Sequence, residues 1–323
     1  MRVFLAGGTG AIGRRLVPLL AMQGHEVTAT TRIAAKADLL HELGATPVVV
    51  DGLDAAAMRE AVSSARPDVV VHQLTALAGV SDLRRFDDAF AATNLLRTRG
   101  TDILLEAALG AGASRFVAQS YTGWPNAREG GPVKDEADPL DQTPPASMRR
   151  TLAAIRHLEA AVTTADGLDG VVLRYGGLYG PGTSIAEDGE HAVLVRKRRF
   201  PIVGDGAGIW SFVHVDDAAR ATVAAIEGPA AGVFNVVDDK PAPVSEWLPI
   251  LAEALGAAAP RRVPVWVGRL AAGEAVVSMM TSVRGSSNAK AKRELGWRPL
   301  WASWRDGFRR GLSVRGAWEA IAA

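Results

Sequence analysis

The sequence predicts an α/β protein, with a doubly wound parallel sheet followed by a smaller C-terminal α/β lobe. Short apolar runs alternate with helical patterns through the first 175 residues. This alternation stops after Gly176, where turns rich in glycine and proline begin. Strands and helices in strict alternation form a parallel sheet with helices on both faces. The 323 residues exceed the size of one ordinary core, so we expect two lobes.

Each predicted strand is a short apolar run, as expected for a strand that is buried on both faces. The six runs cover residues 3–6, 27–31, 46–50, 69–71, 115–120 and 171–175. The helical patterns between them cover residues 11–23, 36–43, 55–64, 90–109 and 147–164. The sheet is therefore expected in the first half of the chain.

The composition excludes several classes of protein. Hydrophobic residues make up 48% of the chain and charged residues 22%, which is typical of a folded globular protein. The formal net charge of +1 gives no electrostatic reason to expect a nucleic acid or an anionic membrane as partner. The chain contains no cysteine, which excludes a thiolate nucleophile and a Cys-ligated metal. Its 6 histidines are scattered, so we expect no catalytic metal.

One apolar stretch, residues 263–283, has the length of a membrane span. It contains Arg269 and Glu274, which would be costly in the middle of a bilayer, so we expect a buried or interfacial helix instead. Arg14 and Arg15 interrupt the apolar N-terminus, which argues against a signal peptide. We therefore expect a cytoplasmic location.

The most informative motif is a glycine-rich turn between the first predicted strand and the first helix. Gly7 permits the tight turn, Gly10 lets the backbone approach a pyrophosphate, and Gly13 lets the helix pack close to the strand. The free N–H groups and the dipole at the helix start favour phosphates. The motif predicts a Rossmann-type dinucleotide site. The full turn reads Gly7-Gly8-Thr9-Gly10-Ala11-Ile12-Gly13, and we expect Thr9, Ala11 and Ile12 to contact the cofactor as well.

The G-x-x-G-x-x-G spacing resembles that of the short-chain dehydrogenase/reductase superfamily. Four later stretches resemble its extended branch, the NAD-dependent epimerase/dehydratase family: residues 173–182, 200–206, 211–217 and 291–299. The resemblance covers nearly the whole chain. It implies a dinucleotide-binding domain over residues 1–175, to which residues 211–237 return, and a substrate lobe formed by residues 176–210 and 238–323. Dimers are common in this family, so a homodimer is one of the states to expect.

The residue after the second predicted strand indicates which cofactor binds. An acidic residue there would bind the ribose 2′-hydroxyl of NAD, but this chain has Thr30-Thr31-Arg32. A neutral residue followed by Arg32 suits a 2′-phosphate, which favours NADP(H) over NAD(H). A solvated arginine on a loop is the alternative interpretation. The resemblance extends the predicted cofactor contacts to Asp51, Gly52, Leu53, Leu74, Thr75, Gln119, Tyr175 and Leu178.

The catalytic residues depart from the family pattern. Members of the superfamily usually carry a Tyr-x-x-x-Lys pair on a helix, in which the cation lowers the phenol pKa and so assists proton exchange during hydride transfer. The chain has only 3 tyrosines, and none has a lysine four residues later. Counting back from Glu159, the Lys position holds Ile155 and the Tyr position holds Thr151. The Ser/Thr position on the preceding strand falls on Tyr121, with Ser120 one residue earlier.

Three interpretations remain open from the sequence. Catalysis is retained with altered residues, in which case Tyr121 and Ser120 are the candidates and Tyr121 the expected proton donor. Alternatively, the protein binds NADP(H) without turnover, as a sensor or interaction module. In the third, the substrate supplies its own acid or base and the enzyme transfers only hydride. The first favours an NADP(H)-dependent oxidoreductase, epimerase or dehydratase acting on a small organic molecule.

The substrate pocket also differs from that of nucleotide-sugar enzymes. Many extended members carry an arginine for the diphosphate shortly before the Phe-Val-His-Val stretch, but this chain has Trp210 there. An indole cannot neutralise a diphosphate, which argues against a nucleotide sugar, although Trp210 as ordinary core packing is an equal alternative. We expect Trp124 and Tyr179 to line the pocket with it. A nucleotide-sugar epimerase or dehydratase stays a further alternative, because the basic run 196–199 could bind phosphate.

Overall fold

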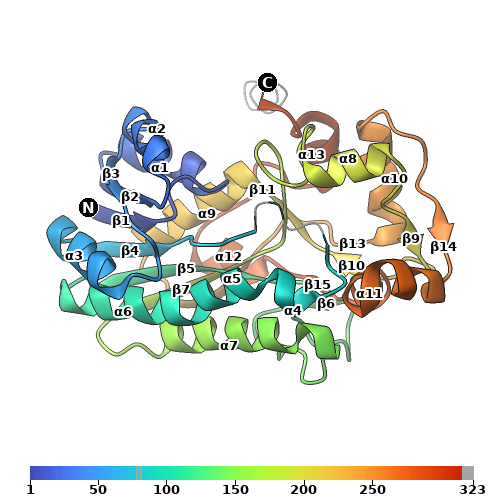
Figure 1. The fold of residues 1–323 in the computed structure, drawn as a ribbon, viewed down its shortest axis with the longest axis horizontal. Helices are drawn as coiled ribbons and strands as arrows, with labels where there is room; N and C mark the ends of the chain where they lie inside the picture. The colour runs from blue at the N-terminus through green and yellow to red at the C-terminus, as the bar shows by residue number, and fades with distance from the viewer. Residues whose placement is uncertain (78, 80–81, 315–323) are drawn as a thin grey trace.

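A computed structural model describes residues 1–77, 79 and 82–314, and its centre is a seven-stranded parallel sheet (Figure 1). The strand order is β12-β7-β5-β4-β1-β2-β3. The chain therefore runs outward from β1 to one edge and returns to β4 before it runs to the other edge. The point between β1 and β4, where the order reverses, is the usual place for a dinucleotide. The strands are β1 (Arg2–Ala6), β2 (Glu26–Thr31), β3 (Thr46–Val49), β4 (Val69–His72), β5 (Arg115–Tyr121), β7 (Asp169–Tyr175) and β12 (Gly232–Val236).

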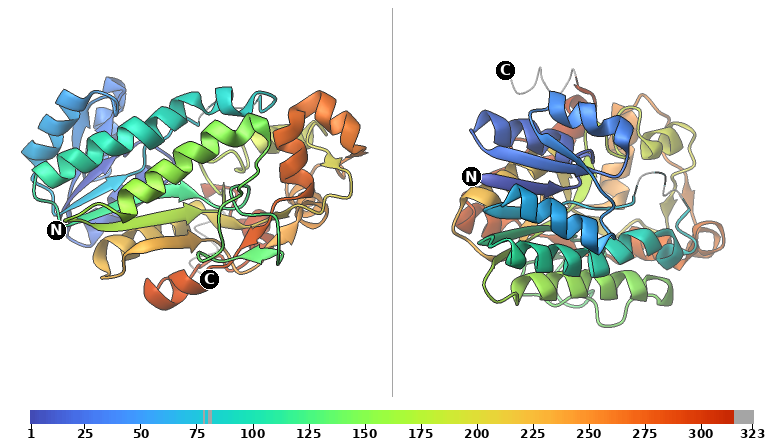
Figure 2. Two further views of the ribbon diagram at one scale, coloured as in Figure 1. Left: turned by 90° about the horizontal axis from the view of Figure 1, so that it is seen from below. Right: turned by 60° about the vertical axis from the view of Figure 1, so that its left-hand side comes forward.

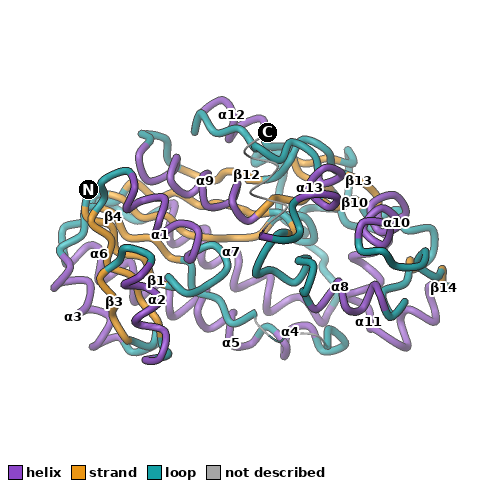
Figure 3. Tube along the Cα trace, turned by 90° about the horizontal axis from the view of Figure 1, so that it is seen from above, coloured by secondary structure: helices purple, strands orange, loops and turns teal. Residues whose placement is uncertain are grey.

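Helices cover both faces of this sheet, which confirms the predicted α/β fold class (Figures 2 and 3). One face carries α1 (Gly13–Met22) and α9 (Val215–Glu227), which pack against each other. The opposite face carries α3 (Ala55–Ala65), α6 (Thr101–Gly110) and α7 (Arg149–Thr163). The short helix α2 (Ala37–Glu42) packs on β3.

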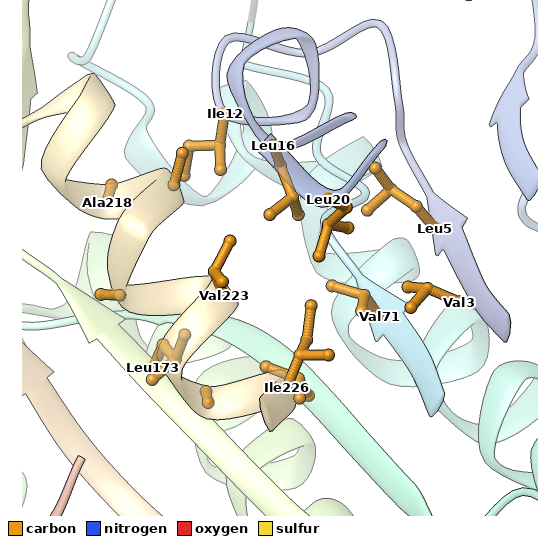
Figure 4. Packing of buried hydrophobic residues seen from close by; sticks show 14 of the residues in the cluster. Val3, Leu5, Ile12, Leu16, Leu20, Val71, Leu173, Ala218, Val223 and Ile226 are labelled. Atoms are coloured by element: carbon orange, nitrogen blue, oxygen red, sulfur yellow. The ribbon is translucent and has the colours of Figure 1, made fainter. Parts of the chain in front are cut away.

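The alternation of side chains along β1 explains why its sequence is apolar from Val3 to Ala6. Val3 and Leu5 join the core under α1 and α9, whereas Phe4 and Ala6 join the core under the other helices. Figure 4 shows the first of these cores, with Leu16 of α1 among the side chains that meet the sheet. Both faces of the strand are buried, so neither has a position for a polar side chain.

Segments from later in the chain complete the main sheet and the helices that cover it. β12 pairs with β7 in the main sheet, and α9 packs on the sheet beside α1. Two short parallel pairs connect this region to the rest: β8 (Gly177–Tyr179) with β11 (Phe212–His214), and β6 (Val133–Lys134) with β15 (Gly285–Ser286). Helix α12 (Ala289–Glu294) packs on β12.

The C-terminal lobe has its own core beyond the carboxyl ends of the strands (Figure 1). Its largest buried side chains are those of Trp247, Trp304, Tyr179, Phe212 and Phe308. Its helices are α8 (Glu190–Arg196), α10 (Val244–Ala254), α11 (Val265–Thr281) and α13 (Trp304–Arg310). Its short strand pairs are β9 (Ile202–Val203) with β14 (Arg262–Val263) and β10 (Ile209–Trp210) with β13 (Ala242–Pro243).

One predicted helix is irregular. The pattern over residues 90–109 predicts a single α-helix, but the structure has α5 (Ala91–Leu95), a π-helical turn η2 (Leu96–Gly100) and then α6. A further short helix, α4 (Phe86–Ala89), precedes α5. A π turn inserts one extra residue into a helix and rotates the next helical turns, and such insertions are common at functional sites. Here it carries Arg97, whose side chain is buried.

The apolar stretch near residue 270 is α11, which bends at Gly273. This glycine has φ 85°, and the helix on either side of it is therefore not continuous. No helix within residues 1–77, 79 and 82–314 is long and apolar enough to cross a membrane.

Candidate active site

The glycine-rich turn lies at the carboxyl end of β1, next to the end of β4. Gly7 has φ 101°, and a Cβ on it would lie 2.8 Å from the Gln73 carbonyl oxygen, so the turn requires glycine. A Cβ on Gly13 would collide with the backbone oxygens of Gly7 and Gly8. Gly10 differs, because its Cβ would meet only the Gly7 oxygen, at 3.4 Å, and its φ is not positive. The fold itself does not require glycine at position 10, which fits a position kept open for a ligand.

Threonines at the end of β2 hold this turn in place. The Thr30 hydroxyl accepts a hydrogen bond from the Gly7 N–H at 3.0 Å, and the Thr30 carbonyl accepts one from the Gly8 N–H at 3.0 Å. The Thr9 hydroxyl donates to that of Thr31 at 3.5 Å. The first turn of α1 follows directly, so its N–H groups face the same space. These residues fit the pyrophosphate of a dinucleotide.

Arg32 follows β2 with an exposed side chain and forms no ion pair with any residue that the structure describes. A second exposed guanidinium, that of Arg14 in the first turn of α1, points toward the turn that follows β8, because a Cβ on Gly182 would come within 2.9 Å of its Nη2. No sequence motif singled out Arg14 as a cofactor residue.

The remaining predicted cofactor residues line the carboxyl ends of the strands. Asp51 follows β3 and its carboxylate accepts the Leu53 N–H at 2.9 Å. Gly52 lies against Leu74, since a Cβ on it would be 2.5 Å from Leu74 Cδ1. Thr75 follows Leu74 beyond β4. Two half-buried residues come from further strands: Gln119 in β5 and Leu178 in β8.

Two predictions need correction because the side chains are buried in cores. Tyr175 is 1% exposed, and its hydroxyl is hydrogen-bonded to Gln73 at 3.2 Å and to Thr222 at 2.7 Å. That phenol is not available to a cofactor. Tyr179 is 0% exposed, and its ring packs edge-on against Phe212 and Phe308. It stabilises the C-terminal lobe and does not line a substrate pocket.

The other aromatic candidates do come together. Tyr121 at the end of β5, Trp124 and Trp210 line one small hollow between the sheet and the C-terminal lobe. The Trp210 indole donates to the Met279 carbonyl at 2.8 Å, which fixes its ring. The Tyr121 and Trp124 ring centroids are 6.5 Å apart. The complete lining is Tyr121, Thr122, Gly123, Trp124, Ile209, Trp210, Ser211, Met279 and Val283.

The family's Tyr and Lys positions on α7 serve the structure instead. Thr151 is fully buried, and its N–H and hydroxyl both donate to the Asp87 carboxylate, at 2.8 and 2.7 Å. Asp87 also accepts the Arg150 N–H at 3.0 Å. The first turn of a helix has N–H groups without partners in the helix, so Asp87 of α4 acts as a cap for α7. Ile155, at the Lys position, is fully buried in an apolar cluster.

Ser120 is also buried and hydrogen-bonded within the fold, although the sequence predicts it as a catalytic candidate. It is 4% exposed and its hydroxyl donates to Glu159 at 2.7 Å. Glu159 forms a two-point ion pair with Arg174, with N–O distances of 2.8 and 2.6 Å. Ser120 therefore faces α7, whereas Tyr121, the next residue along the strand, faces the hollow.

Among the described residues that line the hollow, Tyr121 is thus the one ionisable group. Burial raises the pKa of its phenol to about 12, against an opposing effect of the Arg97 guanidinium. The phenol is therefore neutral at physiological pH and has a proton to donate. Sequence reasoning missed Arg97, because only the π turn places it near Tyr121. Nowhere in residues 1–77, 79 and 82–314 do three metal-ligating side chains gather.

Comparisons with known proteins agree with this architecture. The model of the NAD dependent epimerase/dehydratase family matches residues 3–237. A protein of Streptomyces sp. named 3-diazoavenalumate denitrifying reductase is 47% identical over 313 residues, which are 96% of this chain and 100% of that protein. The UDP-glucose 4-epimerase of Thermus thermophilus, solved with NAD, is 25% identical and superposes with a TM-score of 0.73 over 97% of this chain and 98% of that one.

A human epimerase family protein solved with NADPH has a TM-score of 0.73 at 21% identity, and covers 96% of this chain and 98% of its own. That likeness shows the fold alone. Relatives thus bind NAD or NADPH, and a nicotinamide dinucleotide is the cofactor that fits the glycine-rich turn between β1 and α1. The chain belongs to the NAD-dependent epimerase/dehydratase family, in the extended branch of the short-chain dehydrogenase/reductase superfamily, and is an NAD(P)-dependent enzyme.

Proposed function

We propose that this protein is an NADPH-dependent reductase that transfers hydride to a small aromatic diazo compound and releases N2. The observation that carries the proposal is the hollow at the end of β5. Its walls are aromatic and no charged residue stands among the described residues that line it, while the usual proton-donating pair is replaced by buried Thr151 and Ile155. Such a site suits a flat acceptor whose reduction does not depend on that pair. The relative at 47% identity is named for a reductive removal of nitrogen from a diazo compound.

For an arenediazonium ion, the reaction balances without a proton from the enzyme. Bound NADPH supplies a hydride. In an arenediazonium ion, the hydride adds to the terminal nitrogen and gives Ar–N=N–H. The carbon–nitrogen bond then breaks, N2 leaves, and the hydrogen ends on the ring carbon, so that Ar–N2⁺ plus H⁻ becomes Ar–H plus N2. Trp124 and Trp210 would hold the ring between aromatic faces, and Tyr121 would donate a hydrogen bond to a polar substituent.

The same hollow argues against a nucleotide sugar. A diphosphate needs cations at hydrogen-bond distance, usually arginine. The lining offers one phenol, two small hydroxyl side chains and no cation. The indole of Trp210 occupies the corresponding position and is fixed by Met279. A nucleotide-sugar substrate would therefore be held without charge compensation.

The proposal is tested by supplying the enzyme with hydroxy-substituted arenediazonium compounds and NADPH that carries deuterium at nicotinamide C4. The expected result is enzyme-dependent loss of NADPH, N2 release, and one deuterium on the product ring. A reaction without enzyme sets the background. A parallel panel of aryl ketones tests ordinary carbonyl reduction. Tight NADPH binding with no turnover on either panel would instead identify a silent binding module, and ketone reduction without N2 release would also reject the proposal.

We also propose that NADP(H) is preferred over NAD(H), because Arg32 is exposed and directly follows Thr31, whose hydroxyl accepts a hydrogen bond from Thr9 of the glycine-rich turn. Arg32→Ala is expected to weaken NADPH binding about tenfold and to leave NADH binding almost unchanged, because only NADPH carries the 2′-phosphate. Quenching of tryptophan fluorescence measures both affinities. Arg59→Ala on the distant helix α3 is the control. Equal losses for both cofactors would remove Arg32 from the 2′-phosphate site.

A further inference from the structure

A buried arginine that the sequence did not single out acts electrostatically on the Tyr121 phenol that lines the hollow. Arg97 is 6% exposed and stands in the π turn η2, which packs against α7. His72 at the end of β4 fixes this turn, because its Nε2 lies 3.2 Å from both the Leu96 carbonyl oxygen and the Thr101 hydroxyl. The turn therefore brings Arg97 to the carboxyl end of the sheet, where β4 and β5 end.

The guanidinium of Arg97 has no counter-ion among the described residues. Its Nη1 is buried and has no hydrogen-bond partner. The carboxylate of Glu159 is the anion that attracts it, but that carboxylate already accepts two hydrogen bonds from Arg174 and one from Ser120. Burial lowers the pKa of Arg97 to about 10, so it stays charged at neutral pH. An unpaired buried cation is costly to a fold, which suggests that it has a function.

The groups around Arg97 leave one positive charge in excess. Glu159 and Arg174 neutralise each other. His72 is neutral, because burial and the charge of Arg97 lower its pKa to about 4. Tyr121 is the remaining ionisable group that Arg97 influences. The Tyr121 hydroxyl has no hydrogen-bond partner in the described part of the chain, so this phenol is free to act in the hollow.

We propose that Tyr121 and Arg97 form the phenol–cation pair of this active site, with Arg97 supplying from a neighbouring helix the positive charge that relatives place on α7. Arg97 is a positioning residue that acts through Tyr121. Its role deepens the proposed function. Hydride transfer to a neutral acceptor, such as a diazo compound in its quinone form, leaves one negative charge on the product oxygen. Tyr121 donates its hydrogen bond, and then its proton, to that oxygen, and Arg97 stabilises the phenolate of Tyr121 that results.

The pair is tested without a substrate. A tyrosine analogue with several ring fluorines titrates at lower pH than tyrosine, and fluorine NMR then follows each of the three tyrosines separately. Tyr121→Phe identifies the signal of Tyr121. Arg97→Met is expected to raise the pKa of that phenol by about one pH unit, and Arg97→Lys to restore it. Arg115→Met, which removes a buried arginine at the opposite end of β5, is expected to leave the titration unchanged.

Stability provides a second measurement that separates this role from a structural one. Removal of an unpaired buried charge leaves no opposite charge without its counter-ion. The Arg97→Met variant is therefore expected to have the same melting temperature as the wild type or a higher one. With a diazo substrate, kcat is expected to fall about tenfold in Arg97→Met with little change in KM, and Arg97→Lys to recover part of it. An unchanged Tyr121 titration, or a lower melting temperature without a titration shift, would overturn the pair. Failure of the diazo assay alone would overturn only the proposed function.

Discussion

Replacement of Gly13 by alanine is expected to destabilise the fold by about 3 kcal/mol and to abolish cofactor binding. The new Cβ would lie 2.6 Å from the Gly8 carbonyl oxygen and would also collide with that of Gly7. Both are backbone atoms in the glycine-rich turn, and Thr30 holds that turn from β2 through two hydrogen bonds. The turn cannot yield without breaking those bonds, and α1 cannot move away without opening the core that it shares with α9. Chemical denaturation measures the stability, and fluorescence titration measures NADPH binding.

Gly10→Ala is the matched control for this prediction. Its Cβ would meet only the Gly7 oxygen at 3.4 Å, and the residue does not have a positive φ. We expect it to unfold at the same denaturant concentration as the wild type but to bind NADPH at least about tenfold more weakly, because the methyl group occupies the space of the pyrophosphate. If Gly10→Ala bound NADPH normally, the cofactor would lie elsewhere. If Gly13→Ala were fully stable, the close approach of α1 to β1 would be unnecessary.

Glu159→Gln is expected to cost about 3–5 kcal/mol of stability, although the two side chains have nearly the same shape. Glu159 is 6% exposed and is the partner of Arg174, which is also 6% exposed. Removal of its charge leaves Arg174 buried without a counter-ion. Arg97 lies close enough to be influenced by the same carboxylate, so two buried arginines then repel each other. Urea denaturation measures this loss: the urea concentration at the midpoint of unfolding is expected to fall, while the dependence of the unfolding free energy on urea concentration stays unchanged.

A surface ion pair on the same face of the sheet provides the comparison. Arg59 of α3 and Glu106 of α6 are 3.0 Å apart, with side chains 55% and 68% exposed. Solvent screens both charges, so Glu106→Gln is expected to change stability by less than about 1 kcal/mol. Equal effects of the two substitutions would show that the Glu159–Arg174 pair is solvated in the native protein. A double change of Glu159→Leu and Arg174→Met is expected to recover most of the loss, since it removes both charges together.

The features that could be predicted from the sequence are those that depend on neighbouring residues. The apolar runs indicated six of the seven strands of the main sheet and missed β12, and the strand–glycine–helix order predicted a dinucleotide site at the first turn. The absence of a lysine four residues after any tyrosine is likewise a property of the sequence alone. These predictions need no knowledge of how distant segments pack.

The features that could not be predicted depend on contacts between distant segments. Thr151 is fixed by Asp87, which lies 64 residues earlier in the chain, and no local pattern links them. The 3.6-residue periodicity of an α-helix does not reveal the extra residue of a π turn. The burial of the Arg97 side chain therefore could not be predicted from the sequence. Tyr175 and Tyr179 matched family positions in the sequence, but the two cores that enclose their rings form only when the later strands and helices fold over them.

The contact between Asp87 and Thr151 also determines what the family's Tyr-x-x-x-Lys pair would meet in this chain. A tyrosine at position 151 would lose the short hydroxyl that donates to Asp87 and would bring a large ring to a fully buried position. A lysine at position 155 would then enter an apolar cluster without a partner. Each of the two substitutions alone is therefore expected to lower stability. A redesign that installs the family's pair would have to rebuild the Asp87 contact and the apolar cluster around Ile155 at the same time.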